Sequence, residues 1–151
     1  MILVDANLLV YSFSSAMPEH AAALPWLEGQ FAARERLALP WESVNAFLRL
    51  VTNPRVFPKP VTPLTAWTQV EDWLHHPGTW VPVPTDQHAS IMGELYHGGS
   101  FAANDVPNVH LAALAISHGL RLASHDAGFA RFGGLRWFDP IAEAIPSRPP
   151  S

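Results

Sequence analysis

The sequence predicts a three-layer α/β/α sandwich built on a mostly parallel sheet of four to five strands. Short apolar runs typical of buried strands alternate with longer segments whose apolar residues recur three and four apart, as they do in helices. Such alternation implies crossover connections and a sheet that helices cover on both faces. With 151 residues, 48% of them hydrophobic, the chain is long enough for one domain with a proper core and too short for two.

The expected elements follow one another in a regular order. The first strand is a short apolar run directly after Met1, and the second ends where Pro40 interrupts the chain. Gly119 stops the last helical pattern, since glycine commonly follows helix C-termini. The expected strands are Ile2–Val4, Leu37–Leu39, Trp80–Val83 and Leu120–Ser124, with a fifth around Leu135–Phe138. The helical patterns cover Pro18–Ala33, Ser43–Val51, Pro63–His75, Gln87–Tyr96 and Val106–His118.

One segment between two of these helices is rich in proline. Asn53–Pro63 is interpreted as an extended connector rather than a domain boundary, because neither side of it is long enough to hold a full core. Residues 1–145 are therefore expected to form one domain. The residues that follow, 146–151, are expected to be a disordered tail.

The composition excludes several classes of site. The chain has no cysteine, which excludes disulfides, thiolate zinc sites and cysteine nucleophiles and fits a reducing compartment. Any metal ion must be held by oxygen or imidazole. The N-terminus lacks the basic flank and long apolar core of a signal peptide, and no apolar run reaches membrane-spanning length. We therefore expect a cytoplasmic protein without a membrane partner.

The charge balance bears on nucleic-acid binding. The formal net charge of −4 argues against a protein that binds nucleic acid by electrostatics alone, since such proteins are normally basic. It does not argue against an enzyme whose bound cations attract phosphate groups.

Three carboxylates fall just beyond the C-terminal ends of separate expected strands. Asp5 follows the first strand, before an expected turn, Glu42 follows the second, and Asp126 follows the fourth. Each has a simpler interpretation: Asp5 as the cap of a helix, Glu42 as a charge that complements a helix dipole, and Asp126 as a turn residue. In a parallel sheet, however, these strand ends share the edge where ligands bind.

Such a cluster of acids is expected to need a cation. Carboxylates brought together raise one another's pKa values unless a positive charge neutralises them. Hard oxygen ligands without a thiolate select Mg²⁺ or Mn²⁺. A metal ion held in this way can activate a water and orient a phosphodiester for in-line attack.

A further pair of polar residues begins the expected helix at 106–118. Asp105 is a candidate metal ligand, although it equally fits the N-cap of that helix, with Pro107 in the first turn. Asn108, three residues on, is placed to face the same edge as the acids.

Longer motifs surround these residues. They read ILVDANLLVYSF at the start, LPWESVNAFLRLVTNPRVF in the middle, and DVPNVHLAALAISHGLRLASHDAGFARFGGLRWFDP near the end. Together they resemble the PIN-domain ribonucleases, and specifically the VapC-type toxins of bacterial toxin–antitoxin pairs. The resemblance covers nearly the whole chain, and it implies a PIN-like fold.

The resemblance also implies a site and partners. The family's acidic metal site falls on Asp5, Glu42, Asn108 and Asp126, with Ser124 as the small hydroxyl residue near the last acid and Asn7 in support. In that family, one or two divalent cations in this site cleave RNA. The partner is a VapB-type antitoxin whose basic tail blocks the site, and homodimers are common.

The sequence departs from the family pattern at two positions. Asn108 stands where the family has an aspartate, and Gly128 stands where a second acid often follows Asp126. The first departure removes one negative charge from the expected metal site. We therefore expect weaker metal binding and reduced cleavage. Asp105 would partly replace the missing aspartate if its side chain turned inward.

Two other functions compete with this one. An aspartate-nucleophile phosphatase or receiver-like domain also places an acid after its first strand, but the phosphatases need a second aspartate where Asn7 stands. Both classes use a lysine near the phosphoryl group, and Lys59 lies in the proline-rich connector. The second competitor is a PIN-like module that binds antitoxin or RNA without cleaving it, which Asn108 keeps open.

The remaining polar and aromatic residues carry weaker expectations. His110, His118 and His125 lie near the expected site but lack zinc-enzyme spacing. Arginines can contact RNA phosphates through their planar fork, and solvated surface is an equal alternative. The six tryptophans are interpreted mainly as core or interface residues.

Overall fold

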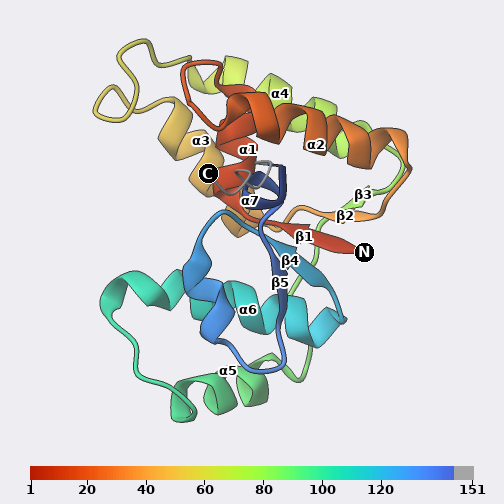
Figure 1. Ribbon diagram of the computed structural model, residues 1–151, viewed down its shortest axis with the longest axis vertical. Helices are drawn as coiled ribbons and strands as arrows, with labels where there is room; N and C mark the ends of the chain where they lie inside the picture. Colours follow the sequence, from red (N-terminus) through yellow and green to blue (C-terminus); the bar gives the residue numbers. More distant parts are fainter. Residues whose placement is uncertain (145–151) are drawn as a thin grey trace, which may run out of the picture.

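The fold is built on one parallel sheet. The computed structural model describes residues 1–144 (Figure 1), and the expected tail at 146–151 lies outside them. The sheet has five strands in the order β3-β2-β1-β4-β5, and each neighbouring pair is parallel. The strands are β1 (Ile2–Val4), β2 (Leu37–Ala38), β3 (Thr79–Trp80), β4 (Arg121–Ala123) and β5 (Arg136–Phe138).

The strand order reverses direction beside β1. From β1 the chain adds β2 and then β3 on one side, and it returns to place β4 and β5 on the other side. In β1, Leu3 pairs with Ala38 of β2 and with Leu122 of β4. The C-terminal ends of β1 and β4 therefore form the topological switch point, where open α/β sheets bind their ligands.

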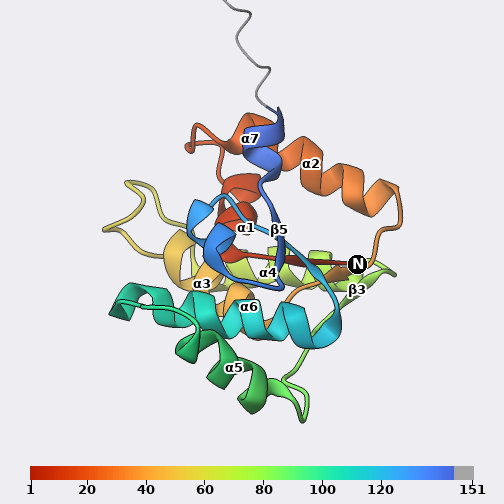
Figure 2. The same cartoon turned by 60° about the horizontal axis from the view of Figure 1, so that its bottom comes forward.

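Helices cover both faces of the sheet. In Figures 1 and 2, α5 and α6 lie on one side and the other helices lie on the opposite side. The helices are α1 (Ala6–Phe13), α2 (His20–Ala32), α3 (Trp41–Val51), α4 (Pro63–His75), α5 (His88–His97), α6 (Val106–His118) and α7 (Pro140–Ala144), with short 3₁₀ turns η1 (Ala103–Asp105) and η2 (Ala127–Arg131). The expected three-layer sandwich is confirmed.

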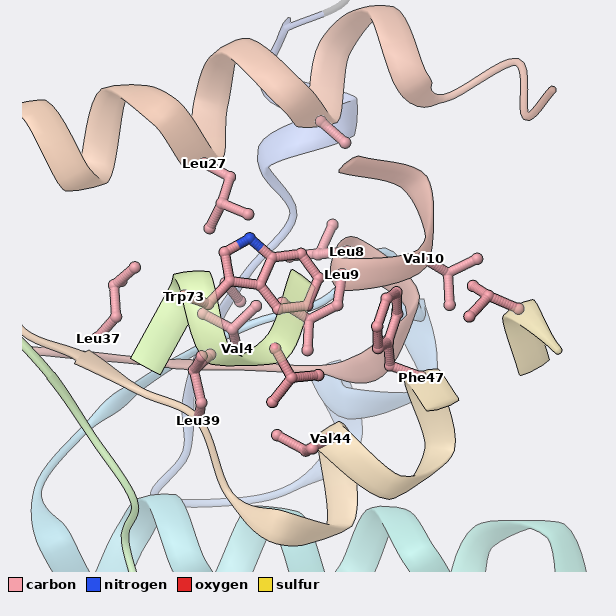
Figure 3. Close-up of a cluster of buried hydrophobic side chains, with 14 of the residues drawn as sticks. Val4, Leu8, Leu9, Val10, Leu27, Leu37, Leu39, Val44, Phe47 and Trp73 are labelled. Carbon is pink, nitrogen blue, oxygen red and sulfur yellow. The ribbon is translucent and has the colours of Figure 1, made fainter. Parts of the chain in front are cut away.

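Alternate side chains of the central strands fill two separate cores. Val4 points into the first core, among α1, α3 and α4, where Phe47 packs edge-on against Phe13 and Trp73 with ring centroids 5.4 and 4.9 Å apart (Figure 3). Leu3, the neighbour of Val4, instead belongs to the second core with buried residues of α6. This period of two is what a strand buried on both faces requires.

Most expected elements are confirmed, and one strand and one turn differ. The helices expected at Pro63–His75 and Val106–His118 have those bounds. The strand expected at Trp80–Val83 ends at Trp80, because Pro82 lacks the N–H that a ladder hydrogen bond needs. No turn follows Asp5, since α1 begins at Ala6.

Two helices have no sequence signal of helical period. The eight residues of α1 make only about two turns and directly continue the apolar run of β1, so no helical period stands out from the strand-like pattern. The five residues of α7 are too few to show a period, although Pro140 suits a first helical position. The connector expected at 53–63 contains no helix or strand before α4 begins at Pro63.

Within residues 1–144, no helix combines the length and apolar character needed to cross a bilayer.

Candidate active site

The candidate site lies at the switch point of the sheet. Asp5 directly follows β1 and is the N-cap residue of α1, and its Oδ1 accepts a hydrogen bond from the Ala6 N–H at 2.7 Å. Asp126 follows β4 and is the N-cap residue of η2. The cap and ligand interpretations of Asp5 are therefore compatible, because the cap bond uses one carboxylate oxygen and leaves the other for a second contact.

Ser124 connects the two carboxylates. Its buried hydroxyl donates to Asp5 Oδ2 at 2.6 Å and accepts from the backbone N–H of Asp126 at 3.0 Å. The Asn7 side-chain amide also donates to this hydroxyl, at 3.1 Å, and its carbonyl oxygen accepts from the His125 N–H at 3.3 Å. These bonds hold the segments after β1 and β4 against each other.

Asn108 joins the network from the first turn of α6. Its amide nitrogen donates to Asp126 Oδ2 at 2.9 Å, while Asp126 Oδ1 accepts from the Gly128 N–H at 2.8 Å. An aspartate at position 108 would instead face a second carboxylate at this distance and repel it. The amide therefore satisfies Asp126 without a cation.

Gly128 has a geometric reason to lack a side chain. A Cβ atom built at this position would lie 2.9 Å from Asp126 Oδ1, closer than real contacts allow. The residue that departs from the family pattern thus lets the backbone close tightly around the Asp126 carboxylate.

The electrostatics of Asp5 reflect its surroundings. Burial raises the pKa of the Asp5 carboxyl above its ordinary value, and the Asp126 charge adds a smaller rise, against the opposing hydrogen bonds from Ser124 and Ala6. A carboxylate that is desolvated and faces a second acid is stabilised by a nearby cation.

Glu42 lies at the side of the site, in the first turn of α3. Its Oε1 is 2.9 Å from Nε2 of His110, and Nδ1 of that ring is 3.1 Å from Nε2 of His88. Burial lowers the pKa of His88, and the neighbouring His110 lowers it further. The Glu42–His110 contact joins residues 68 apart in sequence, and nothing in the local pattern around either residue indicated it.

Two of the acids, Asp5 and Glu42, border a common hollow, whereas Asp126 is not among the residues that line it. A pocket of about 90 Å³ has Asp5, Glu42 and Asn108 among its lining residues, together with Ser43, whose buried hydroxyl oxygen lacks a hydrogen-bond partner within residues 1–144. A volume of roughly 10–15 Å³ suffices for one water, so the pocket has room for several. It is therefore large enough for a hydrated ion and small compared with a whole nucleotide chain.

Asp105 is not brought into this network. Its Oδ2 accepts from the Ala102 N–H at 2.8 Å, and its Oδ1 forms an ion pair with Arg131. These two contacts, the backbone hydrogen bond first, lower the pKa of Asp105. The expected substitution for the missing aspartate is therefore not supported: Asp105 is the N-cap residue of α6 by position, and its carboxylate faces Arg131.

The other expected residues have structural partners. His118 Nε2 contacts the Val83 carbonyl at 2.7 Å, and His125 Nδ1 contacts Asp139 at 2.8 Å. Arg136 donates to the Gly119 carbonyl. Among the tryptophans, Trp73 is core, whereas Trp41, which precedes Glu42, is 44% exposed.

The oxygen atoms of the site are of the kind that a hard divalent cation binds, but Asn108 contributes no negative charge. In the part of the chain that the structure describes, no group of three or more His, Asp or Glu side chains is placed to hold a metal ion. The two switch-point carboxylates are nonetheless linked through Ser124, and Asn108 contacts Asp126 through its amide nitrogen, so its carbonyl oxygen would become a third oxygen donor only when the amide turns. Carboxylate and amide oxygens are ligands of Mg²⁺ and Mn²⁺.

Comparison with known proteins identifies the family. The family model described as the PIN domain matches residues 2–135 of this chain. The chain belongs to the PIN domain family. The fold described above is therefore that of a PIN domain.

Relatives of this PIN domain share most of its length. Ribonuclease VapC37 of Mycobacterium tuberculosis is 39% identical over 142 residues, which are 94% of this chain and 99% of that protein. Ribonuclease VapC43 of the same species is 37% identical over 93% of this chain and 96% of its own. The structure of VapBC2 from Rickettsia felis, bound to a DNA fragment from the promoter, superposes with a TM-score of 0.66 at 15% identity, covering 92% of this chain and 98% of that one. At this identity the superposition shows the fold.

Proposed function

We propose that this PIN domain is a Mg²⁺-dependent endoribonuclease and the toxin of a VapBC-type toxin–antitoxin system. The observation that carries the proposal is the linked cluster at the switch point, in which Ser124 joins Asp5 to Asp126 and Asn108 binds Asp126. Two relatives that are 39% and 37% identical over nearly the whole chain and are named ribonucleases support the reaction class.

Each residue of the cluster has a role in this proposal. Asp5, Asp126 and the Asn108 carbonyl oxygen would hold Mg²⁺, or Mn²⁺ in its place, and Glu42 borders the same pocket from α3. Bound there, the cation supplies a reactive water and neutralises phosphate charge. Ser124 and Asn7 orient Asp5, and Glu42 accepts the proton of the attacking water. RNA is bound with its scissile phosphate at the pocket mouth.

The change from aspartate to asparagine sets the strength of this site. In the observed rotamer, the Asn108 amide nitrogen faces Asp126, so the amide must turn before its oxygen can bind a cation. A neutral ligand also attracts the ion less than a carboxylate does. We therefore propose a ribonuclease with lowered metal affinity and slow cleavage.

A second function is favoured by the same hydrogen bond. Because the Asn108 amide satisfies Asp126 without an ion, the chain can keep its fold with an empty site. In that case it is a catalytically impaired PIN module that binds an antitoxin or RNA without cutting. The two functions differ in whether RNA is cleaved.

The proposed partners follow from the relatives. The R. felis structure contains VapBC2, and by analogy we propose a VapB-type antitoxin as the partner of this chain. We also propose that the chain forms a homodimer and acts in the cytoplasm. Sedimentation of the purified chain, alone and with the antitoxin, measures both assemblies.

The test is metal-dependent cleavage of RNA. The purified chain is incubated with total cellular RNA and Mg²⁺, Mn²⁺ or EDTA, and new RNA ends are read by sequencing. Discrete cuts that need the metal, and that disappear in Asp126→Asn, support the ribonuclease. Intact RNA under every condition, together with no metal binding, would leave the binding module.

A further inference from the structure

A chain of two histidines ends on Glu42. His110 Nε2 lies 2.9 Å from Glu42 Oε1, and His110 Nδ1 lies 3.1 Å from His88 Nε2. The two imidazole rings meet edge to face, with centroids 4.8 Å apart and an interplanar angle of 73°. The three residues come from α3, α6 and α5, so the contact ties three helices together at one side of the site.

The chemistry of the three groups sets the direction of both hydrogen bonds. An ionised carboxylate can only accept, so His110 Nε2 must carry the proton that it donates to Glu42. When the His110 ring is neutral, its Nδ1 is an acceptor, and His88 Nε2 then donates to it. His88 Nδ1 is left as a bare lone pair.

The surroundings of His88 agree with this direction. Its Nδ1 is buried and has no hydrogen-bond partner within residues 1–144. A buried N–H without an acceptor is the rarer and costlier arrangement in proteins, so an unprotonated Nδ1 is the better fit. The two rings therefore share one tautomer, with the proton on Nε2 of each.

Glu42 needs such a partner because of where it lies. Its side chain is 45% exposed, and a glutamate in solvent samples many rotamers, so holding it in one of them costs conformational entropy. The bond from His110 engages Oε1, and no hydrogen bond of the described residues engages Oε2. One oxygen is thus fixed to the protein while the other remains available beside the pocket.

We propose that His110 is a positioning residue for Glu42, and that His88 fixes the tautomer in which His110 can donate. This inference rests on the proposed function, in which Glu42 takes the proton of the attacking water. Neither histidine touches RNA or the reacting atoms in this account. Both act by holding the Glu42 carboxylate in place.

A double-mutant cycle on RNA cleavage tests the dependence on Glu42. His110→Ala is expected to lower kcat about 10–100-fold, the range seen when a partner that orients an active-site ligand is lost, with KM changed little. In a Glu42→Ala background, the same substitution should have no further effect. Independent, multiplying losses from the two substitutions would overturn the proposal.

Two further variants separate positioning from general damage. His110→Gln offers an amide N–H in place of the imidazole donor, so it should recover most of the kcat that His110→Ala loses. His118→Ala, on the same helix but bonded to the Val83 carbonyl, should leave kcat unchanged. Equal losses in all three variants would overturn the proposal, and thermal melts show whether each variant is folded.

An NMR measurement tests the pairing without activity or metal. Long-range ¹H–¹⁵N spectra above the ordinary histidine pKa should show His110 and His88 protonated on Nε2, with the His110 resonance shifted in Glu42→Ala. A proton on His110 Nδ1, or no response to Glu42→Ala, would overturn the pairing. Cleavage that is absent from the unmodified chain and every variant would overturn the proposed function, and the spectra then decide the pairing alone.

Discussion

A single amide links α6 to the carboxylate that follows β4. Asn108 donates to Asp126 at the position where two carboxylates would otherwise repel each other. Asp5 likewise accepts two hydrogen bonds, from Ser124 at 2.6 Å and from the Ala6 N–H at 2.7 Å, but burial and, less strongly, the Asp126 charge still raise its pKa. The remaining demand for a cation is therefore concentrated on Asp5.

The raised pKa of Asp5 predicts how pH and Mg²⁺ act together on stability. The folded chain holds the Asp5 proton more tightly than the unfolded chain, so the metal-free protein loses stability as pH rises from about 3.8 through the raised pKa. Mg²⁺ favours the ionised form of Asp5, so it should raise Tm near neutral pH. Near pH 3.8, the ordinary pKa of an aspartate, it should raise Tm little. Thermal melts with Mg²⁺ or EDTA measure this, and equal Mg²⁺ shifts at both pH values would contradict it.

The closeness of Gly128 to Asp126 predicts a second effect on metal binding. Gly128→Ala places a methyl group where only 2.9 Å is available, so the Asp126 carboxylate must move. We expect Mn²⁺ to bind roughly 10-fold more weakly, which is the low end of the range seen when a group that orients a metal ligand is lost. Calorimetry measures this affinity. The matched control is Gly133→Ala, whose new Cβ meets nothing within 4 Å. Equal affinities for the two variants would contradict the expected displacement.

At the scale of elements, α6 carries both the site and the second core. It begins beside Asp105, presents Asn108 and His110, and buries its apolar side against the sheet before Gly119 ends it. Gly119 has φ 66°, a left-handed conformation that side chains other than glycine adopt at a cost of about 1–2 kcal/mol. The termination of the helix therefore depends on this glycine.

Replacing two glycines by alanine should have opposite effects on stability. Gly119→Ala should destabilise the fold by about 1 kcal/mol purely through backbone conformation, because its Cβ would meet nothing within 4 Å. Gly29→Ala, inside α2 and equally free of contacts, should stabilise by roughly 0.5–1 kcal/mol. Each kcal/mol shifts Tm by about 2–4 °C in a domain of this size. The same sign of change in both variants would contradict the account.

For the whole molecule, the sequence predicts those features that depend on strand direction and on the period of the apolar residues. Carboxyl ends of parallel strands meet at one edge, which is why the proximity of Asp5 and Asp126 follows from strand positions alone. The pairing of Asp105 with Arg131, and that of Glu42 with His110, link distant segments through side-chain geometry, so no local pattern indicates them. Helix α1 was missed because it is short and continues the apolar run of β1, so the pattern there is typical of a strand followed by a turn.

We propose that this PIN domain is a metal-dependent ribonuclease whose site is weakened by Asn108. The most direct test compares RNA cleavage by the chain and by Asn108→Asp across a series of Mg²⁺ concentrations, with EDTA as the blank. We expect the variant to cleave faster and to reach half its maximal rate at lower Mg²⁺, because a third carboxylate replaces a neutral amide. Cleavage by neither protein at any Mg²⁺ concentration, or cleavage that persists in EDTA, would contradict the claim.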